Sequence, residues 1–280
     1  MNISSAIDGI EKAAAESIKA EQGDYYGDDG LLYCGKCNTP KQTRIMIFDK
    51  ERTPFCLCKC AVEKRDREEA ERKRIEFERR VRDLRRMGFP ESDMQEWNFA
   101  NDDRSNEKIS TVARNYVDNF EKMREDGKGL LFFGKTGTGK SFAAACIANA
   151  LIDKGYPVLM TNFARIRGTL QGLFDGRQEY LDSFNRFPLL ILDDLAAESK
   201  SEYMQEIVYE VINNRYLAGL PLIVTTNLTA DELKHPADVT NQRTFSRLFE
   251  MCIPFEVAGT DRRRDRLKEA HAEYKDILGY

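Results

Sequence analysis

The chain has 280 residues, of which 41% are hydrophobic and 32% are charged, so it is predicted to fold as a globular protein with a substantial core. Its formal net charge of -4 excludes attraction of the whole chain to nucleic acid, so any such contact needs a local basic face. The amino-terminal residues lack the basic start and apolar core of a signal peptide, and no apolar run reaches membrane-spanning length. We therefore expect a cytoplasmic protein that makes no membrane contact.

The first 22 residues contain a periodic apolar stripe. Ile3, Ile7, Ile10 and Ile18 recur at helical spacing, which predicts a short amphipathic helix over residues 1–22. An apolar stripe does not by itself identify the surface against which the helix packs. The helix is expected either to pack on the cysteine-rich segment that follows or to bind a partner protein.

Five of the seven cysteines lie close together in the next part of the chain. Cys34 and Cys37 form a C-x-x-C pair, and the trio Cys56, Cys58 and Cys60 offers candidates for a second pair. In a reducing compartment such clusters are more typical of metal ligands than of disulfides. Four thiolates suit a closed tetrahedral zinc site, which leaves one cysteine spare. The alternatives are free thiols and an iron–sulfur cluster. The spacing of the cysteines matches neither of the two common ferredoxin patterns, which argues against the cluster.

From Ala61 to Arg86 the sequence is almost wholly charged, with sparse apolar positions. This pattern predicts a solvated linker helix that ends at Gly88 and Pro90. The arginines also allow a DNA-binding face, but interspersed acidic residues nearly cancel their charge.

Apolar strand-like runs alternate with helical segments from Ser105 onward. A helix is predicted over residues 141–154, and strands are predicted at residues 130–133, 157–160, 189–192, 220–225 and 253–257. Short buried strands separated by helices indicate a mainly parallel α/β sheet with helices on both faces.

The segment Gly134–Ser141 reads G-x-x-x-x-G-K-S and lies between a predicted strand and a predicted helix. In this context the glycines let backbone N–H groups face phosphate oxygens, Lys140 reaches the β and γ phosphates, and the Ser141 hydroxyl coordinates Mg²⁺. We expect ATP or ADP to bind here. The expected contact residues are Gly134, Lys135, Thr136, Gly137, Thr138, Gly139, Lys140, Ser141 and Phe142.

Two later strands end in polar residues that suit phosphate chemistry. Asp193 and Asp194 follow the apolar run 189–192, so Asp193 is predicted to hold Mg²⁺ and Asp194 to orient or deprotonate the attacking water. Alternatively, the pair forms a turn with a helix cap. Asn227 ends the next strand and is expected either to reach the γ phosphate or to cap the following helix.

Five motifs occur in a fixed order along the chain: the phosphate loop Gly134–Ser141, then LLILDDLAAE, TTNLT, RTFSRLFEMC and GTDRRR. Together they resemble the AAA+ ATPases of the replicative-helicase-loader type, the DnaC and DnaI proteins, and the IstB-like transposition helpers have similar cores. The resemblance covers roughly residues 95–265. It implies a P-loop AAA+ (ASCE) sheet sandwiched by helices, preceded by a small zinc-binding module and a charged linker helix.

The resemblance also implies roles for particular residues. Asn227 corresponds to sensor 1 and Arg247 to the arginine finger, with Arg243 as the alternative finger. Either Arg262 or Arg263 corresponds to sensor 2. The C-x-C ending that is usual in the family implies Cys58 and Cys60 as the second zinc pair, which leaves Cys56 spare. Many AAA+ proteins have Glu where this chain has Asp194, so we expect slow, switch-like hydrolysis.

Three segments follow from these observations: residues 1–62 as a helix plus zinc module, 63–94 as a linker, and 95–280 as the ATPase domain. The resemblance implies an ATP-dependent loader of the hexameric replicative DNA helicase onto single-stranded DNA, which self-associates through its ATPase domain. A transposition helper that binds duplex DNA and a nucleotide-switched adaptor with negligible turnover are the alternatives. A small-molecule kinase fits less well, because the acids and arginines suit water attack and sensing between subunits.

Overall fold

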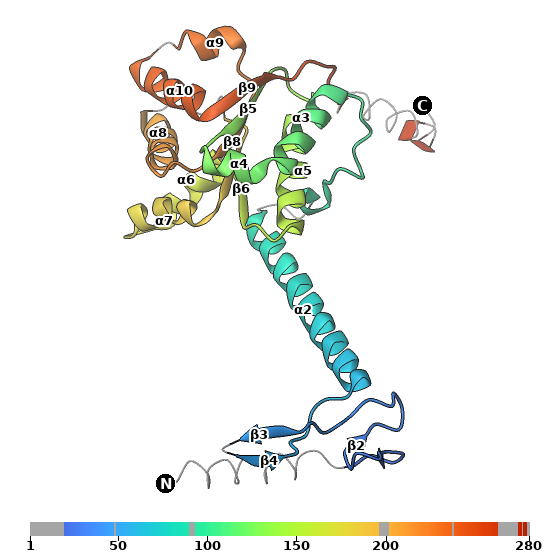
Figure 1. Cartoon of the computed structure of the whole chain (residues 1–280). Coiled ribbons are helices and arrows are strands. Elements are labelled where there is room, and N and C mark those ends of the chain that lie inside the picture. Colours follow the sequence, from blue (N-terminus) through green and yellow to red (C-terminus); the bar gives the residue numbers. More distant parts are fainter. Residues whose placement is uncertain are drawn as a thin grey trace. The chain divides into compact units, whose positions relative to one another are not determined.

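The computed structural model describes residues 20–47, 49–89, 93–195, 202–236, 238–262, 274–275 and 277–278. The chain divides into two compact units, residues 1–78 and 79–280, and each is described by itself (Figure 1). The helix predicted over residues 1–22 falls, up to residue 19, outside the described residues.

Two small antiparallel hairpins make up the described strands of the first unit. One pairs β1 (Tyr25–Tyr26) with β2 (Leu32–Tyr33), and the other pairs β3 (Ile45–Ile47) with β4 (Lys50–Arg52). The rings of Tyr25 and Tyr33 stack across the first hairpin with centroids 5.8 Å apart. Such short strands bury little apolar surface, so this unit needs another source of stability.

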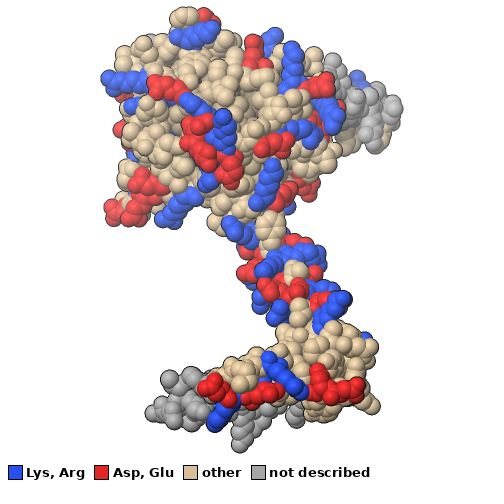
Figure 2. All heavy atoms as spheres, in the orientation of Figure 1, with Lys and Arg blue, Asp and Glu red and all other residues tan. Residues whose placement is uncertain are grey.

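Helix α2 (Lys59–Gly88) confirms the predicted linker helix and begins two residues earlier than the charged run. Its charges pair along its own surface, for example Lys64 with Glu68 at 3.8 Å and Lys73 with Glu69 at 2.7 Å. Figure 2 shows basic and acidic side chains interspersed along this helix rather than gathered on one side. Exposed pairs of this kind contribute little stability, and they leave no concentrated basic face in the part of α2 that the figure shows.

The second unit is built on a parallel five-stranded sheet, and all five predicted strands are confirmed. The strand order is β6-β7-β8-β5-β9, and every neighbouring pair is parallel. The strands are β5 (Gly129–Phe133), β6 (Val158–Asn162), β7 (Leu189–Asp193), β8 (Leu222–Thr226) and β9 (Cys252–Glu256). Because β8 lies between β7 and β5, the segments that follow these three strands meet at one edge.

Helices cover both faces of this sheet (Figure 1). Leu130 and Phe132 belong to one apolar core and Leu131 to the other, as expected when successive side chains of a strand point to opposite faces. The first core includes α3 (Glu107–Asp118), α4 (Phe120–Glu125), α5 (Lys140–Asp153) and the 3-10 turn η1 (Asp93–Glu96). The second includes α6 (Phe163–Gly172), α7 (Arg177–Ser183), the 3-10 turn η2 (Phe184–Arg186), α8 (Glu202–Leu217), α9 (Ala230–Lys234) and α10 (Val239–Met251).

Cys146 and Cys252, the two cysteines outside the amino-terminal cluster, are both buried. No helix in the described part of the chain is long and apolar enough to cross a bilayer.

Candidate functional site

The phosphate loop follows β5 in a conformation that requires glycine. Gly134, Gly137 and Gly139 have φ angles of 126°, 77° and 97°, a region that L side chains rarely adopt. A Cβ on Gly137 would also lie 1.9 Å from the Asp261 carboxylate. The loop leads directly into α5, so its backbone N–H groups and the helix N-terminus form a cradle for an anion.

The Lys140 side chain joins this loop to the end of β8. Its ammonium donates hydrogen bonds to the carbonyl oxygens of Gly134 at 2.8 Å and Lys135 at 2.7 Å, and to the Asn227 side-chain oxygen at 2.8 Å. Lys140 is only 6% exposed, so its charge acts at this site and is little weakened by water. The structure therefore brings together two residues that are 87 positions apart in the chain.

Thr225 on β8 holds both acids at the end of β7, Asp193 as its last residue and Asp194 directly after it. Its hydroxyl donates to Asp193 Oδ1 at 2.6 Å and accepts the Asp194 backbone N–H at 2.9 Å. Asp194 has a left-handed φ of 55°, which aspartate tolerates better than most side chains. The Asn227 amide donates to Asp194 Oδ1 at 2.9 Å. Both acids are thus held by neighbouring side chains, and both line the same cavity as the phosphate loop.

A cavity of about 420 Å³ connects these groups. Its lining includes the polar residues of the segment 136–141, the two acids, Thr225 and Asn227. It also includes Trp97, Asn101 and Phe142, and the rings of Trp97 and Phe142 lie 5.9 Å apart. Polar groups with a lysine and a pair of neighbouring aromatic rings together suit a nucleotide, because the first can bind phosphates and the second a base.

Trp97 and Asn101 were not predicted from the sequence. They precede the first helix of the core and belong to no recognisable motif, so only their place in the fold reveals them. The sequence offered one hint that Trp97 has a role, because it is the sole tryptophan of the chain.

Arg262, one of the two sensor 2 candidates, lines the cavity. Its backbone N–H donates to the Gly137 carbonyl at 3.1 Å, and its guanidinium pairs with Asp103. The pKa of Asp103 is lowered, chiefly by the Ser105 N–H group and further by Arg262. Arg263, the other sensor 2 candidate, falls outside the described residues.

Arg247 does not line the cavity of its own chain. Its guanidinium carbon lies 4.6 Å from the ring centroid of Tyr209 and 5.8 Å from that of Tyr216, both on α8. Arg243, one turn earlier on α10, is exposed. Neither arginine is brought to the phosphate loop of its own chain, so an arginine finger on α10 would have to act on a neighbouring protomer.

Replacing Thr225 by valine is expected to lower kcat for ATP hydrolysis about 10- to 100-fold, because residues that orient metal-binding carboxylates typically matter on this scale. Valine keeps the shape of threonine but loses the hydroxyl that contacts Asp193 and Asp194. Steady-state hydrolysis at saturating ATP measures the effect. The matched control is Thr226→Val, whose hydroxyl serves the Leu228 N–H instead. Equal losses in the two variants, or none in either, would contradict the assignment.

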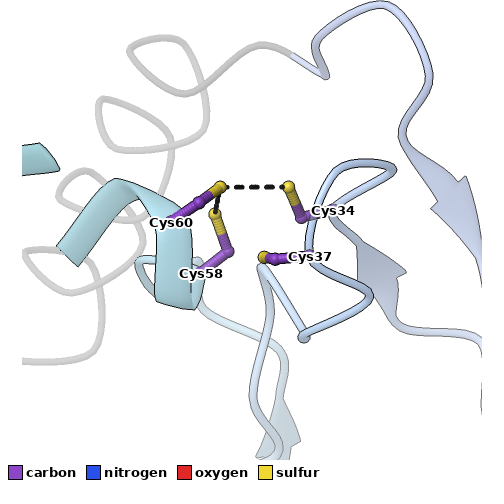
Figure 3. A group of neighbouring side chains, drawn as sticks. All are labelled: Cys34, Cys37, Cys58 and Cys60. Carbon is purple, nitrogen blue, oxygen red and sulfur yellow. Dashed lines mark hydrogen bonds between the residues drawn. The ribbon is translucent and has the colours of Figure 1, made fainter. Parts of the chain in front are cut away.

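The first unit contains a cluster of four cysteines. The sulfur atoms of Cys34, Cys37, Cys58 and Cys60 all lie within 4.8 Å of one another. Figure 3 shows Cys34 and Cys37 on the loop after β2, facing Cys58 and Cys60 at the start of α2. The sulfur of Cys60 lies 3.6 Å from that of Cys34 and 3.4 Å from that of Cys58. Cys56 faces elsewhere, with its sulfur 3.5 Å from the Pro40 carbonyl oxygen.

These four sulfur atoms fit a tetrahedral zinc ion. Zinc–sulfur bonds of about 2.3 Å place tetrahedral sulfurs roughly 3.8 Å apart, close to the spacing found here. The Thr39 hydroxyl lowers the pKa of Cys37 to about 6, which favours a thiolate there, whereas hydrogen bonds with Cys58 and Cys34 raise the pKa of Cys60 to about 12. The structure thus brings together the two cysteine pairs that the resemblance implied and leaves Cys56 out.

Buried charge supports the turn that carries Cys34 and Cys37. The Lys41 ammonium lies 2.6 Å from the Asp24 carboxylate, with both side chains largely buried. Asp24 also accepts the Gly35 backbone N–H at 3.2 Å. A Cβ on Gly35 would lie 1.9 Å from the Gly23 carbonyl oxygen, so this close approach requires glycine.

Comparison with known proteins gives a consistent match. The family model of the IstB-like ATP binding protein matches residues 62–269. The replicative helicase loader DnaI of Bacillus subtilis is 27% identical over 208 residues, which are 69% of this chain and 66% of that protein. The replicative helicase loader DnaC of Escherichia coli K12 is 29% identical over 127 residues, which are 43% of this chain and 50% of that protein.

A solved structure supports the fold. The crystal structure of DnaI matches 64% of this chain and 98% of its own chain, with a TM-score of 0.53 and 24% identity. The chain therefore has the same kind of α/β fold as DnaI, while it spans only about half to two thirds of the curated relatives named above.

Proposed function

Because the chain belongs to the IstB-like ATP binding protein family, we propose that it is an ATP-dependent loader of the replicative DNA helicase onto single-stranded DNA. The observation that carries the proposal is the junction of Lys140, Asn227 and Asp194 at one sheet edge. This arrangement suits hydrolysis by water better than simple nucleotide storage. Two relatives are named replicative helicase loaders, which supports this choice among ATPase functions.

Each residue of the site has a proposed role. The backbone N–H groups of residues 134–141 and the Lys140 ammonium hold the phosphates, and Ser141 and Asp193 hold Mg²⁺. Mg²⁺, when bound, neutralises charge on the phosphate oxygens. Asp194 orients the attacking water and receives its proton, and Asn227 fixes the Asp194 carboxylate. Arg262 contacts the phosphates from the same chain. Trp97 and Phe142 contact the base, and the side-chain amide of Asn101 hydrogen-bonds to the edge of the base.

The cysteine module is proposed to hold Zn²⁺ through Cys34, Cys37, Cys58 and Cys60 and to contact a protein partner. Several large apolar side chains of the module are exposed, including Tyr26 at 70% and Met46 at 67%. Such residues are typical of protein contact surfaces. We retain the division into a module over 1–62, a linker over 63–94 and an ATPase domain over 95–280 as part of this proposal.

Light scattering on a sizing column tests the loader function directly. The full chain, mixed with the hexameric replicative helicase of its host, is expected to form a discrete complex whose amount changes with ATP. The Lys140→Ala variant, which lacks the phosphate-binding ammonium, is the control for the ATP effect. Absence of any complex with an intact helicase would contradict the proposal.

Mixing two inactive variants tests self-association through the ATPase domain. Lys140→Ala removes phosphate binding and Arg247→Ala removes the proposed finger, so each protein alone is expected to hydrolyse little ATP. In mixtures, an Arg247 from one protomer can complete the intact site of the other, and part of the activity is expected to return. Recovery is measured as hydrolysis against mixing ratio. No recovery at any ratio, with Arg243→Ala recovering instead, would assign the finger to Arg243.

A transposition helper is the second candidate, because the matching family model is that of IstB-like proteins. Such a protein would prefer duplex DNA, whereas a loader is expected to prefer single-stranded DNA. Hydrolysis rates with each kind of DNA separate the two functions. Negligible turnover with both would favour the nucleotide-switched adaptor.

A further inference from the structure

We propose that Arg85 and Asn149 are positioning residues for the base-binding end of the cavity, so that the last turns of α2 determine how tightly a purine base is held. The inference rests on the proposed function, because it assigns a nucleotide to this cavity. It deepens that function by giving the end of the charged helix a part in nucleotide recognition.

Asn149 fastens the turn before Trp97 to helix α5. Its side chain is buried, with a residue exposure of 1%. The amide nitrogen donates to the carbonyl oxygens of Met94 and Trp97, each at 2.9 Å, and to that of Ala145 at 3.2 Å. Because α5 also begins with Lys140, one helix carries the phosphate contact at its first turn and the support of Trp97 near its end.

Arg85 reinforces the direction in which the Asn149 amide points. The Arg85 Nε group donates to Asn149 Oδ1 at 3.1 Å, and another guanidinium nitrogen pairs with Asp153. With its oxygen held by a donor, Asn149 keeps its nitrogen toward the carbonyl groups. Without Arg85, Asn149 Oδ1 loses its side-chain donor, and the amide is held only by its own N–H groups.

The end of α2 is fixed in place, so Arg85 is not a mobile surface group. Gly88 approaches β6 so closely that a Cβ there would lie 2.4 Å from the Val158 carbonyl oxygen. Phe89 is 5% exposed and belongs to the same core as α5. Arg86, the next residue on the helix, is exposed and pairs with Asp83 of its own helix. The two adjacent arginines therefore differ in whether they contact Asn149, the residue that holds the turn before Trp97.

The network acts on one end of the cavity. A shift of the Trp97 backbone moves its indole relative to Phe142, where the base would lie. The phosphates contact residues 134–141, and the hydrogen bonds of Arg85 are with Asn149 and Asp153. Loss of Arg85 is therefore expected to weaken contacts to the base while contacts to the phosphates persist.

The test compares Arg85→Ala with Arg86→Ala in the full chain. Binding of Mg-ATP and of inorganic tripolyphosphate is measured by calorimetry, and Trp97, the only tryptophan of the chain, reports base contact by its emission. Loss of the part-buried hydrogen bond to Asn149, together with the pairing to Asp153, is expected to raise the Kd for ATP about threefold to tenfold in Arg85→Ala, through its effect on the turn. The Kd for tripolyphosphate is expected to stay unchanged in both variants, and Arg86→Ala is expected to bind ATP like the unchanged chain.

Arg85→Lys, which retains an N–H donor, is expected to recover part of the affinity for ATP. Equal weakening of ATP and tripolyphosphate in Arg85→Ala would overturn the inference, because it would indicate general damage to the site. Indistinguishable ATP binding by Arg85→Ala and Arg86→Ala, or ATP binding that leaves Trp97 emission unchanged, would also overturn it while leaving the proposed function standing. Failure of the unchanged chain to bind ATP would overturn both.

Discussion

Serine in place of Cys58 is expected to abolish zinc binding and unfold the cysteine module, whereas serine in place of Cys56 is expected to leave one zinc per chain. Cys58 belongs to the group of four sulfurs that lie within 4.8 Å of one another, and Cys56 does not. The described hairpins bury few apolar side chains, so the metal is expected to supply most of the folding free energy, on the order of 10 kcal/mol.

Metal content after dialysis and far-ultraviolet circular dichroism measure the two effects. The variants make a matched pair, since each removes one sulfur atom from the same short segment. Full zinc in Cys58→Ser together with loss of zinc in Cys56→Ser would show that Cys56 is the ligand. Full zinc in both would mean that either cysteine can complete the site.

Methionine in place of Arg215 is expected to destabilise the ATPase unit by about 3 kcal/mol. Arg215 on α8 is fully buried, and its guanidinium donates to the carbonyl oxygens of four residues that precede β7 and β8: Phe184, Phe187, Pro188 and Pro221. Methionine fills a similar volume but has no donor, so these carbonyl groups lose a hydrogen-bond partner inside the protein. Urea unfolding monitored by circular dichroism measures the change.

Burial of the charge works in the opposite direction and limits the expected effect. Desolvation lowers the pKa of Arg215 to about 10, which shows that the buried cation is itself costly. Replacing a buried ion by an apolar residue can therefore be neutral when its partners are also removed. Here the partners are backbone carbonyls, which no side-chain substitution removes. Arg124→Met, at an exposed arginine paired with Glu121, is the control and is expected to change stability little. Equal stability of Arg215→Met and Arg124→Met would refute this account.

The elements of the ATPase unit followed closely from the sequence because their local signals were strong. A short apolar run in the sequence marks each of the five strands. The three glycines of the phosphate loop stand at positions where the backbone has a positive φ angle. The cysteine pairing was left open by spacing alone. Resemblance implied Cys58 and Cys60, and the structure brings these two to Cys34 and Cys37.

The sequence by itself determined the chemistry of each motif and the strand that precedes it. Loop glycines, acids at strand ends and apolar runs are local properties of the chain. The tertiary structure decided how they meet. Only the placement of β8 between β7 and β5 lets Thr225 orient Asp193 and lets Asn227 contact Lys140. The pairing of Trp97 with Phe142 and the support of Trp97 by Asn149 likewise could not be predicted from the sequence. Such contacts join residues about thirty to ninety positions apart, and no local pattern encodes them.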